Sequence, residues 1–323
     1  MRGGAGGTGD GGSGFGGEAV QHGFPFYSKP APRAHPEAAM LRMMGARRKL
    51  LTMVAALTAA AALAPAGVAH AAADPAPPPA KRAMWLWSRA APAAVVAWAE
   101  QHGVKEIFAA VPWAPTTADA SRLRDLRART KAAGIRLAAL GGDPAWAVNP
   151  KDAVAWRQRV SAMKLFDGVH LDVEPYLLPN WVQDQQRIAA SYLTMLDAVR
   201  RAGPEPLEAD VPFWLATVKV GAQNLAEAVI QRVDAITVMS YRDSGAAVLD
   251  VGTDLLARAR KSRLPVRLAA ETQPSADCAY CTFAGRTPSA LRQQLAAIDT
   301  GAKPYPTYQG IAVHDYDSWS RIS

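Results

Sequence analysis

Residues 166–176 read FDGVHLDVEPY, and this stretch decides the fold. Its central residues alternate between two chemical kinds. The apolar set is Val169, Leu171 and Val173, and the polar set is His170, Asp172 and Glu174. A period of two indicates a β-strand with one apolar face and one face that carries an imidazole and two carboxylates. Buried charges cost several kcal/mol per ion unless they are paired, so this face predicts a chemical role, with a structural ion network as the alternative.

From Arg82 onward the chain repeats one unit, which consists of a short strand, a loop and an amphipathic helix. The apolar patterns predict strands at residues 83–87, 106–111, 135–140, 168–174, 206–211, 235–240, 266–271 and 310–316. They predict helices near residues 91–102, 119–133, 151–163, 182–202, 222–231, 246–262 and 287–298. Eight strands with seven intervening helices predict a single-domain α/β protein, a (β/α)8 or TIM barrel, over residues 82–323. We expect the eighth helix to be short or absent, because only residues 317–323 remain for it.

A doubly wound open sheet is the main structural alternative. That fold places a glycine-rich phosphate loop after its first strand. The corresponding stretch here, MWLWSRAAP at residues 84–92, contains no glycine. The length from Arg82 to Ser323 also agrees with the usual barrel size of about 250 residues. The barrel is therefore the expected fold.

The first eighty residues differ in composition from the rest. Residues 1–39 are glycine-rich and aperiodic, which predicts disorder or a misassigned start. Residues 40–71 have the order of an export signal: the basic Arg47, Arg48 and Lys49, an apolar stretch at 50–66, and a small-residue cleavage site at 69–71. Residues 72–81 form a proline-rich tether. We expect a secreted protein that begins near Ala72, without stable membrane insertion once the signal is removed; a membrane anchor on the same apolar stretch is the alternative.

Composition and charge allow a globular protein and exclude little else. Half of the residues are hydrophobic and one fifth are charged. The formal net charge is +8, and the first eighty residues hold seven Lys/Arg against four Asp/Glu, which leaves +5 for the predicted barrel. No basic run with interleaved aromatic residues occurs there, so we expect no nucleic-acid partner.

The chain has two cysteines, Cys278 and Cys281, in the stretch DCAYC. A metal site would need further ligands, and a thioredoxin-like pair would need its own βαβ context. In an exported protein this spacing favours a local disulfide within a loop.

Catalytic groups in such barrels come from the carboxyl ends of the strands and the loops that follow. Glu174 is expected as the last residue of the fourth strand. Other polar and aromatic residues fall at strand ends: Asp210, Trp214, Tyr241, Arg242, Asp243, Glu271, His314, Asp315, Tyr316 and Trp319. Trp85 and Trp87 share one face of the first strand, with Trp85 expected in the core. Carboxylates beside aromatic rings suit carbohydrate chemistry, because acids act on the glycosidic oxygen and flat rings pack on sugars.

Two short motifs carry a resemblance to a known family. DGVHLDVEP resembles the fourth-strand signature Asp-x-x-Asp-x-Asp-x-Glu of glycoside hydrolase family 18, the chitinases and endo-N-acetylglucosaminidases, with matches at Asp167, Asp172 and Glu174. VMSYRD at residues 238–243 resembles the family's sixth-strand Met-x-Tyr-Asp and matches it at Tyr241. The resemblance implies a barrel glycosidase with Glu174 as general acid, and Asp172 and Tyr241 at a substrate acetamido group.

Three positions depart from the family pattern. His170 replaces the middle aspartate, Arg242 stands where the sixth-strand aspartate is expected, and His314 takes the place of a tryptophan that floors the sugar site. We interpret the chain as a divergent relative with another glycan substrate. The expected substrate-binding residues are His170, Tyr176, Asp210, Trp214, Arg242, His314 and Trp87.

Two mechanisms use these residues. In the substrate-assisted version Glu174 protonates the leaving oxygen while the substrate's acetamido carbonyl, held by Asp172 and Tyr241, attacks the anomeric carbon. In the two-carboxylate version Glu174 is acid and base, and Glu271 is the nucleophile, which resembles the arrangement in the large clan of retaining barrel glycosidases. A salt bridge between Glu271 and Arg242 is the alternative role for Glu271.

Two other classes stay open. A non-catalytic, lectin-like glycan-binding barrel would use the same mouth. A metal-dependent hydrolase would use His170, Asp172, Asp210 and His314, but no sharp metal motif accompanies them. We expect a carbohydrate substrate, no metal and no cofactor.

Overall fold

The computed structural model describes residues 81–322, and in this part of the chain eight parallel strands close into a barrel. The barrel strands are β1 (Arg82–Leu86), β2 (Val104–Ala110), β3 (Arg136–Gly141), β4 (Gly168–Leu171), β5 (Leu207–Pro212), β8 (Ala235–Met239), β9 (Val266–Glu271) and β10 (Tyr308–His314). Their order around the ring is β1-β10-β9-β8-β5-β4-β3-β2, so β10 pairs with β1 and closes the barrel. The predicted (β/α)8 barrel is confirmed.

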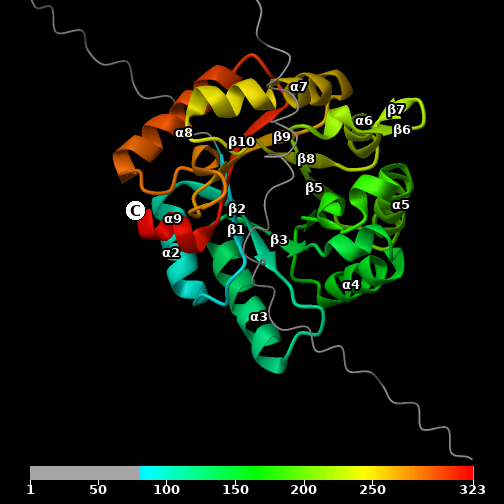
Figure 1. The fold of residues 1–323 in the computed structure, drawn as a ribbon. Helices are drawn as coiled ribbons and strands as arrows, with labels where there is room; N and C mark the ends of the chain where they lie inside the picture. The colour runs from blue at the N-terminus through cyan, green and yellow to red at the C-terminus, as the bar shows by residue number, and fades with distance from the viewer. Residues whose placement is uncertain (1–80, 323) are drawn as a thin grey trace, which may run out of the picture. The chain divides into compact units, whose positions relative to one another are not determined.

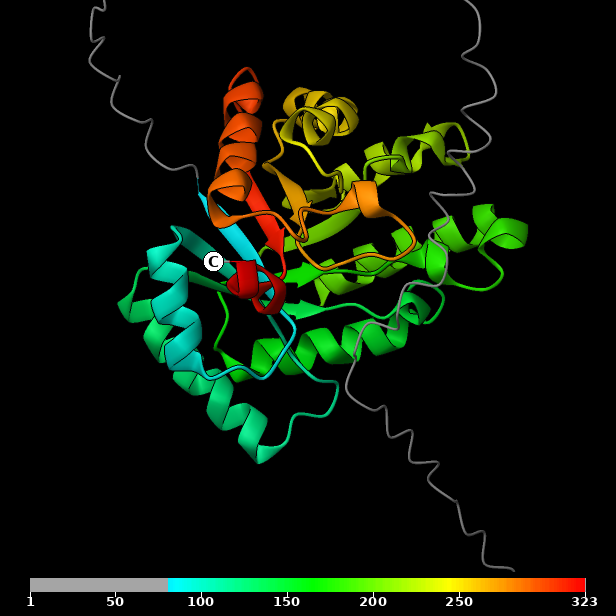
Figure 2. The same cartoon turned by 60° about the vertical axis from the view of Figure 1, so that its left-hand side comes forward.

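Helices alternate with the strands and surround the barrel (Figures 1 and 2). They are α2 (Pro92–Gln101), α3 (Thr117–Ala132), α4 (Pro150–Met163), α5 (Trp181–Arg201), α6 (Leu225–Ile230), α7 (Gly245–Ser262), α8 (Pro288–Ala302) and α9 (Tyr316–Ile322). α9 is the expected short eighth helix. Side chains of Thr116, Ser244 and Thr287 accept a backbone N–H three residues later and cap α3, α7 and α8.

The fifth predicted helix, α6 in the structure, begins later than the predicted residue 222. A two-stranded antiparallel hairpin, β6 (Lys219–Val220) and β7 (Gln223–Asn224), occupies its expected start. Gly221 adopts φ +58° at the hairpin turn, a conformation that glycine takes without steric cost. Asn224 then caps α6 by accepting the Glu227 N–H at 2.9 Å.

The fourth strand ends earlier than predicted. β4 stops at Leu171, so the expectation that Glu174 is its last residue is wrong by three positions. Asp172 N still donates to Gly141 O on β3 at 3.0 Å. Pro175 has no N–H to extend the ladder, and it begins the 3-10 turn η2 (Pro175–Leu177), in which Leu177 N donates to Glu174 O at 3.0 Å. Glu174 nevertheless stays at the carboxyl edge of the barrel.

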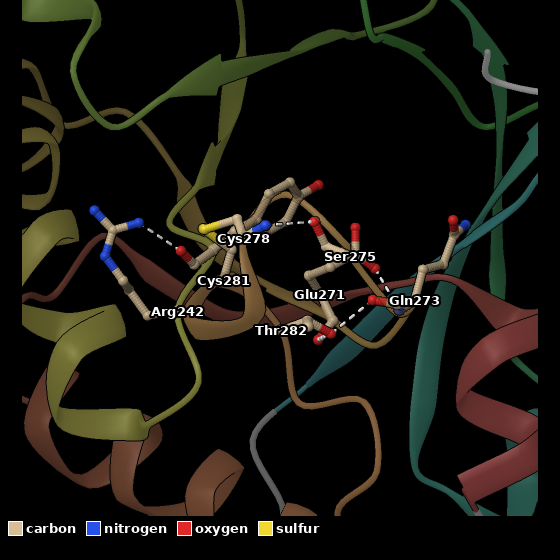
Figure 3. Close-up of a disulfide and its surroundings, with 8 residues drawn as sticks. Arg242, Glu271, Gln273, Ser275, Cys278, Cys281 and Thr282 are labelled. Atoms are coloured by element: carbon tan, nitrogen blue, oxygen red, sulfur yellow. Dashed lines mark hydrogen bonds between the residues drawn. A yellow bond between two sulfur atoms is a disulfide. The ribbon is translucent and has the colours of Figure 1, made fainter. Parts of the chain in front are cut away.

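The loop between β9 and α8 contains the expected local disulfide, Cys278–Cys281 (Figure 3). The short 3-10 turn η4 (Ala279–Cys281) lies inside it. Both sulfur-bearing residues are buried, whereas Tyr280 between them is 47% exposed. The bridge therefore fixes a small turn of the loop beside the carboxyl end of β9.

The predictions for the amino-terminal region lie outside the described residues. These are the aperiodic segment 1–39, the export signal 40–71 and the tether up to residue 80. Within residues 81–322, every helix is too short or too polar to cross a bilayer.

A glycine after β3 sets how closely this strand approaches β4. A Cβ atom at Gly142 would overlap the backbone carbonyl of Asp172. Only a residue without a side chain lets the two segments pass at this distance. Because Asp172 is a candidate site residue, Gly142 positions the site as well as the fold.

We predict that Gly142→Ala lowers the free energy of unfolding by about 1–3 kcal/mol, because the added methyl group forces the Asp172 backbone to move. Gly168→Ala is the matched control, since its methyl group would lie 3.5 Å from Pro206 O, an ordinary contact. Urea unfolding of both variants measures the difference. Equal stabilities of the two variants would contradict the close approach.

Candidate active site

Side chains from several strands meet at the carboxyl end of the barrel, as the sequence predicts. They are Asp172 and Glu174 after β4, Asp210 on β5, Tyr241 and Arg242 after β8, Glu271 at the end of β9 and His314 at the end of β10. All except Glu271 are less than 10% exposed, and the Glu271 side chain is 14% exposed. The barrel thus gathers four carboxyl groups in a largely buried place.

The pKa of the Tyr241 hydroxyl responds to all four of these carboxyl groups. Burial raises the pKa of its hydroxyl well above the usual value, and the charges of Glu271, Asp210, Asp172 and Glu174 raise it further. Electrostatic influence of this kind falls off with distance. The predicted catalytic residues Glu174, Asp172, Tyr241 and Glu271 therefore lie at the same carboxyl end of the barrel.

Glu174 has a hydroxyl partner and an aromatic wall. The Tyr176 hydroxyl donates to Glu174 Oε2, and the Tyr176 ring lies edge-on to Trp214 with 5.0 Å between centroids. A hydroxyl group can donate to a carboxylate or accept from a carboxylic acid. This partner therefore suits a carboxyl group in either protonation state.

Glu271 has three hydrogen-bond donors, two backbone N–H groups and one imidazole. Its Oε1 accepts the backbone N–H groups of Thr272 at 2.8 Å and Gln273 at 2.7 Å. His314 Nδ1 lies 2.9 Å from Oε2. These donors complement a carboxylate rather than a carboxylic acid, because an acid needs an acceptor for its proton.

The tautomer of His314 follows from Trp87. The indole Nε1–H of Trp87 lies 3.0 Å from His314 Nε2, and an indole nitrogen can only donate. Nε2 is therefore the acceptor, and Nδ1 carries the proton that points to Glu271. The sequence placed Trp87, His314 and Glu271 at one mouth; the structure links them in a row.

Arg242 does not pair with Glu271. Among the described residues its guanidinium makes no ion pair, and Nη1 donates to the backbone carbonyl of Tyr241 at 2.6 Å. The guanidinium lies over the ring of Phe213, 4.6 Å from the centroid, and 5.9 Å from the centroid of Tyr280. The salt-bridge alternative for Glu271 is therefore wrong.

His170 points into the barrel and is fully buried. Its Nε2 lies 2.9 Å from Asp210 Oδ2, which also accepts the Trp85 indole N–H at 3.2 Å. The imidazole stacks on the Phe108 ring with centroids 3.7 Å apart. Trp85 is 1% exposed, which confirms its core position.

A layer of buried charges lies below His170, and sequence reasoning missed it. Glu208 on β5 accepts Arg267 Nη1 at 2.6 Å and Thr237 Oγ1 at 2.5 Å, and Arg267 Nη2 donates to Glu106. The signal was available for Glu208 and Arg267, because apolar residues flank each of them on its strand just as they flank His170. The partners could not be read from one strand alone.

Burial alone would lower the pKa of the His170 imidazole, but Asp210 and Glu208 raise it to about 10. Glu208 Oε1 lies 3.7 Å from His170 Nδ1. Burial would raise the pKa of Glu208, yet Arg267 and His170 hold it well below its usual range. Burial also raises the pKa of Asp210. The cluster thus keeps one proton between His170 and Asp210 at neutral pH, with an ionised Glu208 beneath.

A second tyrosine, also missed, reaches the same carboxylates. Tyr192 on α5 is 2% exposed; burial raises the pKa of its hydroxyl, and Asp210 and Asp172 add to the shift. It was read only as part of an amphipathic helix, and nothing in the sequence marks it as different.

Several predicted strand-end residues serve structure instead. Asp167 accepts Arg127 through both oxygens, at 2.5 and 2.8 Å, before β4 begins. Asp315 accepts the Ser318 N–H at 3.0 Å, and Gln273 Nε2 donates to its other oxygen. Trp319 packs edge-on against Trp98 of α2 with centroids 4.6 Å apart. The peptide bond between His314 and Asp315 is cis.

Two cavities flank the barrel. One of about 320 Å³ adjoins the mouth, and its lining includes Thr272, Arg286 and Arg321. One of about 540 Å³ lies at the opposite, amino-terminal end, and its lining includes Glu106, Glu208 and Arg267. We place the candidate chemistry at the mouth, because Glu174, Glu271 and Tyr241 lie there, whereas Glu208 and Glu106 at the opposite end accept hydrogen bonds from Arg267.

The metal site considered on His170, Asp172, Asp210 and His314 does not assemble. Within residues 81–322, no group of three His, Cys, Asp or Glu side chains has the spacing to hold a metal ion. Both ring nitrogens of His314 face Glu271 and Trp87.

The sequence matches no family model and no curated protein. Solved structures that resemble this one include a chitinase of Chromobacterium violaceum, with 14% identity, a TM-score of 0.49 and coverage of 75% of this chain and 98% of that chain. They also include the GH113 β-mannanase AaManA of Alicyclobacillus acidocaldarius (10% identity, TM-score 0.47, coverage 73% and 86%). A third is the spore cortex-lytic enzyme SleL of Bacillus cereus, with 11% identity, a TM-score of 0.47 and coverage of 74% of this chain and 72% of that chain. At these identities the likeness concerns the barrel alone.

We predict that the stabilising effect of His170 declines as pH rises. Its folded pKa of about 10 lies above the unfolded value of about 6.5. Its contribution is therefore complete below pH 6.5 and is lost as pH approaches 10. The difference in unfolding free energy between the wild type and His170→Gln should shrink by a few kcal/mol from pH 6 to pH 10.

Chemical denaturation of both proteins at several pH values measures this difference. Lysine and tyrosine titrations are common to both proteins and largely cancel. A difference that stays constant across the range would show that His170 is not held as an imidazolium.

Proposed function

We propose that this chain is a secreted glycoside hydrolase that acts on a glycan, with Glu174 as general acid. The carrying observation is that two largely buried carboxyl groups, Glu174 after β4 and Glu271 at the end of β9, lie at the carboxyl end of the barrel, although β4 and β9 are three positions apart in the ring. Two carboxyl groups that face one space are what glycosidic bond cleavage requires.

The surroundings support different roles for the two groups. Glu271 accepts two backbone N–H groups and the His314 N–H, which favours a charged nucleophile or stabiliser. Glu174 has the Tyr176 hydroxyl, which tolerates loss and gain of a proton. Environments that separate two carboxyl groups in this way assign acid and base in many enzymes.

In the two-carboxylate route, Glu174 gives its proton to the glycosidic oxygen as the bond to the anomeric carbon breaks. Glu271 attacks that carbon and forms a glycosyl ester. Glu174, now a carboxylate, takes a proton from water, and the resulting hydroxyl group releases the sugar from Glu271. The substrate-assisted route replaces Glu271 by the substrate's acetamido carbonyl, with Asp172 and Tyr241 as its support.

Glu174→Gln should lower kcat by roughly 10²- to 10⁴-fold through loss of acid catalysis. Glu271→Gln should cost as much if Glu271 is the nucleophile, and much less if the substrate's acetamido group attacks. Turnover is measured on a panel of aryl glycosides and cell-wall polysaccharides, with and without a 2-acetamido group. Glu100→Gln, exposed on α2, is the control for the chemical change.

The outcomes separate the candidate functions. Comparable losses on a substrate without an acetamido group favour the two-carboxylate route. Full activity in both variants would remove the hydrolase proposal. Binding of a glycan without turnover would instead favour the lectin-like alternative.

Secretion is a further part of the proposal. It is supported by the signal-like order of residues 40–71 and by the Cys278–Cys281 disulfide, since disulfides persist in oxidising compartments. We expect the mature chain to begin at or near Ala72. Amino-terminal sequencing of protein from the culture medium checks this, and a chain that keeps Met1 or stays in the cytosol would contradict it.

A further inference from the structure

Arg242 is a buried cation at the mouth that lacks a counter-ion among the described residues. It follows β8 by three residues and is 8% exposed. Its one described hydrogen bond goes from Nη1 to Tyr241 O, although a guanidinium has five N–H donors. Burying an ion without a partner costs several kcal/mol.

The other deeply buried arginine shows the usual arrangement. Arg157 Nη2 lies 3.1 Å from Glu205 Oε2. The nearly buried Arg267 pairs with Glu208 and Glu106. Arg242 differs from both, so a structural ion pair does not explain its position.

Aromatic rings hold the Arg242 guanidinium in place. Phe213 comes from the segment after β5, and Tyr280 comes from the disulfide loop after β9. Figure 3 shows Arg242 among the residues that surround the Cys278–Cys281 bridge. Rings on a guanidinium exclude water from its faces but leave its planar edge to donate hydrogen bonds. The side chain is therefore orientated for a ligand that accepts at that edge.

The carboxyl groups of the mouth do not fill this role. Glu271 is engaged by His314 and two backbone N–H groups, and Glu174 by Tyr176. Arg242 also stands next to Tyr241, which lies among the candidate catalytic carboxyl groups. Both residues follow β8, so the guanidinium lies at the same carboxyl end of the barrel as these groups.

We propose that Arg242 binds an anionic group on the sugar, in the simplest case the carboxylate of a uronic acid, so that the substrate is an acidic glycan. This inference rests on the proposed glycoside hydrolase function. A carboxylate matches the guanidinium edge with two parallel hydrogen bonds. Its charge also supplies the counter-ion that Arg242 lacks among residues 81–322, and this attraction offsets the repulsion that the mouth carboxylates exert on an acidic sugar.

The experiment uses matched pairs of aryl glycosides that share anomer and linkage and differ only at C6, as carboxylate or as hydroxymethyl. The expected result is a higher kcat/KM for the uronide of a pair. Glycosides with a sulfate ester form a second arm, which tells a carboxylate site from a general anion site. Binding of the same compounds to Glu174→Gln, measured by calorimetry, gives a readout that does not need turnover.

Arg242→Gln should reduce kcat/KM for the uronide by roughly 10- to 100-fold, the loss expected for one charge-assisted contact. Its kcat/KM for the neutral member should change little. Arg292→Gln, exposed on α8, removes an equal charge without touching the Phe213 and Tyr280 rings and should leave the preference intact.

The results separate this inference from the proposed function. Preference for the neutral member, equal affinity for both, or no binding of any charged member overturns the inference. Equal losses on both members of a pair, with a lower melting temperature, would make Arg242 a structural clamp for the disulfide loop. Unchanged turnover in Glu174→Gln overturns the proposed function instead, whatever Arg242 binds.

Discussion

A row of buried charges crosses the barrel interior, and the geometry of the mouth depends on it. Asp210, His170, Glu208, Arg267 and Glu106 follow one another with alternating sign. Removal of one member of such a buried pair typically costs about 3–5 kcal/mol, because it leaves an uncompensated ion. The row therefore fixes the relative register of β2, β4, β5 and β9 as firmly as their backbone ladders do. Asp172 lies two residues beyond His170, so the same register sets its height.

The mouth above this row is asymmetric. Glu271 sits in a rigid cradle of backbone amides and an imidazole whose tautomer Trp87 dictates. Glu174 lies on a short irregular segment, and its carboxyl group accepts a hydrogen bond from the Tyr176 hydroxyl. The two carboxyl groups therefore differ in their hydrogen-bond partners: two backbone N–H groups and an imidazole for Glu271, and a phenol hydroxyl for Glu174.

Sequence periodicity predicted the barrel, its helices and most strand-end residues, because periods of 2 and 3.6 are local properties. It did not predict that β4 ends at Leu171, because a proline at position 175 does not show which earlier residue makes the last hydrogen bond to the neighbouring strand. The salt bridge to Arg242 that it offered as an alternative role for Glu271 is wrong, because the partner of Glu271 is His314. The partner of a side chain depends on the order of the strands around the barrel and on the length of the side chains. The sequence of a single strand carries neither kind of information. The sequence offered two roles for the polar face of residues 170–174, a structural ion network and a chemical site. Both apply, because His170 belongs to the ion network and Glu174 lies at the mouth.

The last strand of the barrel determines when, during synthesis of the chain, the candidate site can be completed. β10 pairs with β1 to complete the ring, and its last residue, His314, orients Glu271. A chain made from its amino end therefore carries Glu174, Tyr241 and Glu271 long before the seam and the imidazole exist. The half of the chain that contains Glu174 lacks the candidate nucleophile, and the half that contains Glu271 lacks the candidate acid. A site that uses the His314 imidazole is therefore complete only after β10 has been made and has paired with β1.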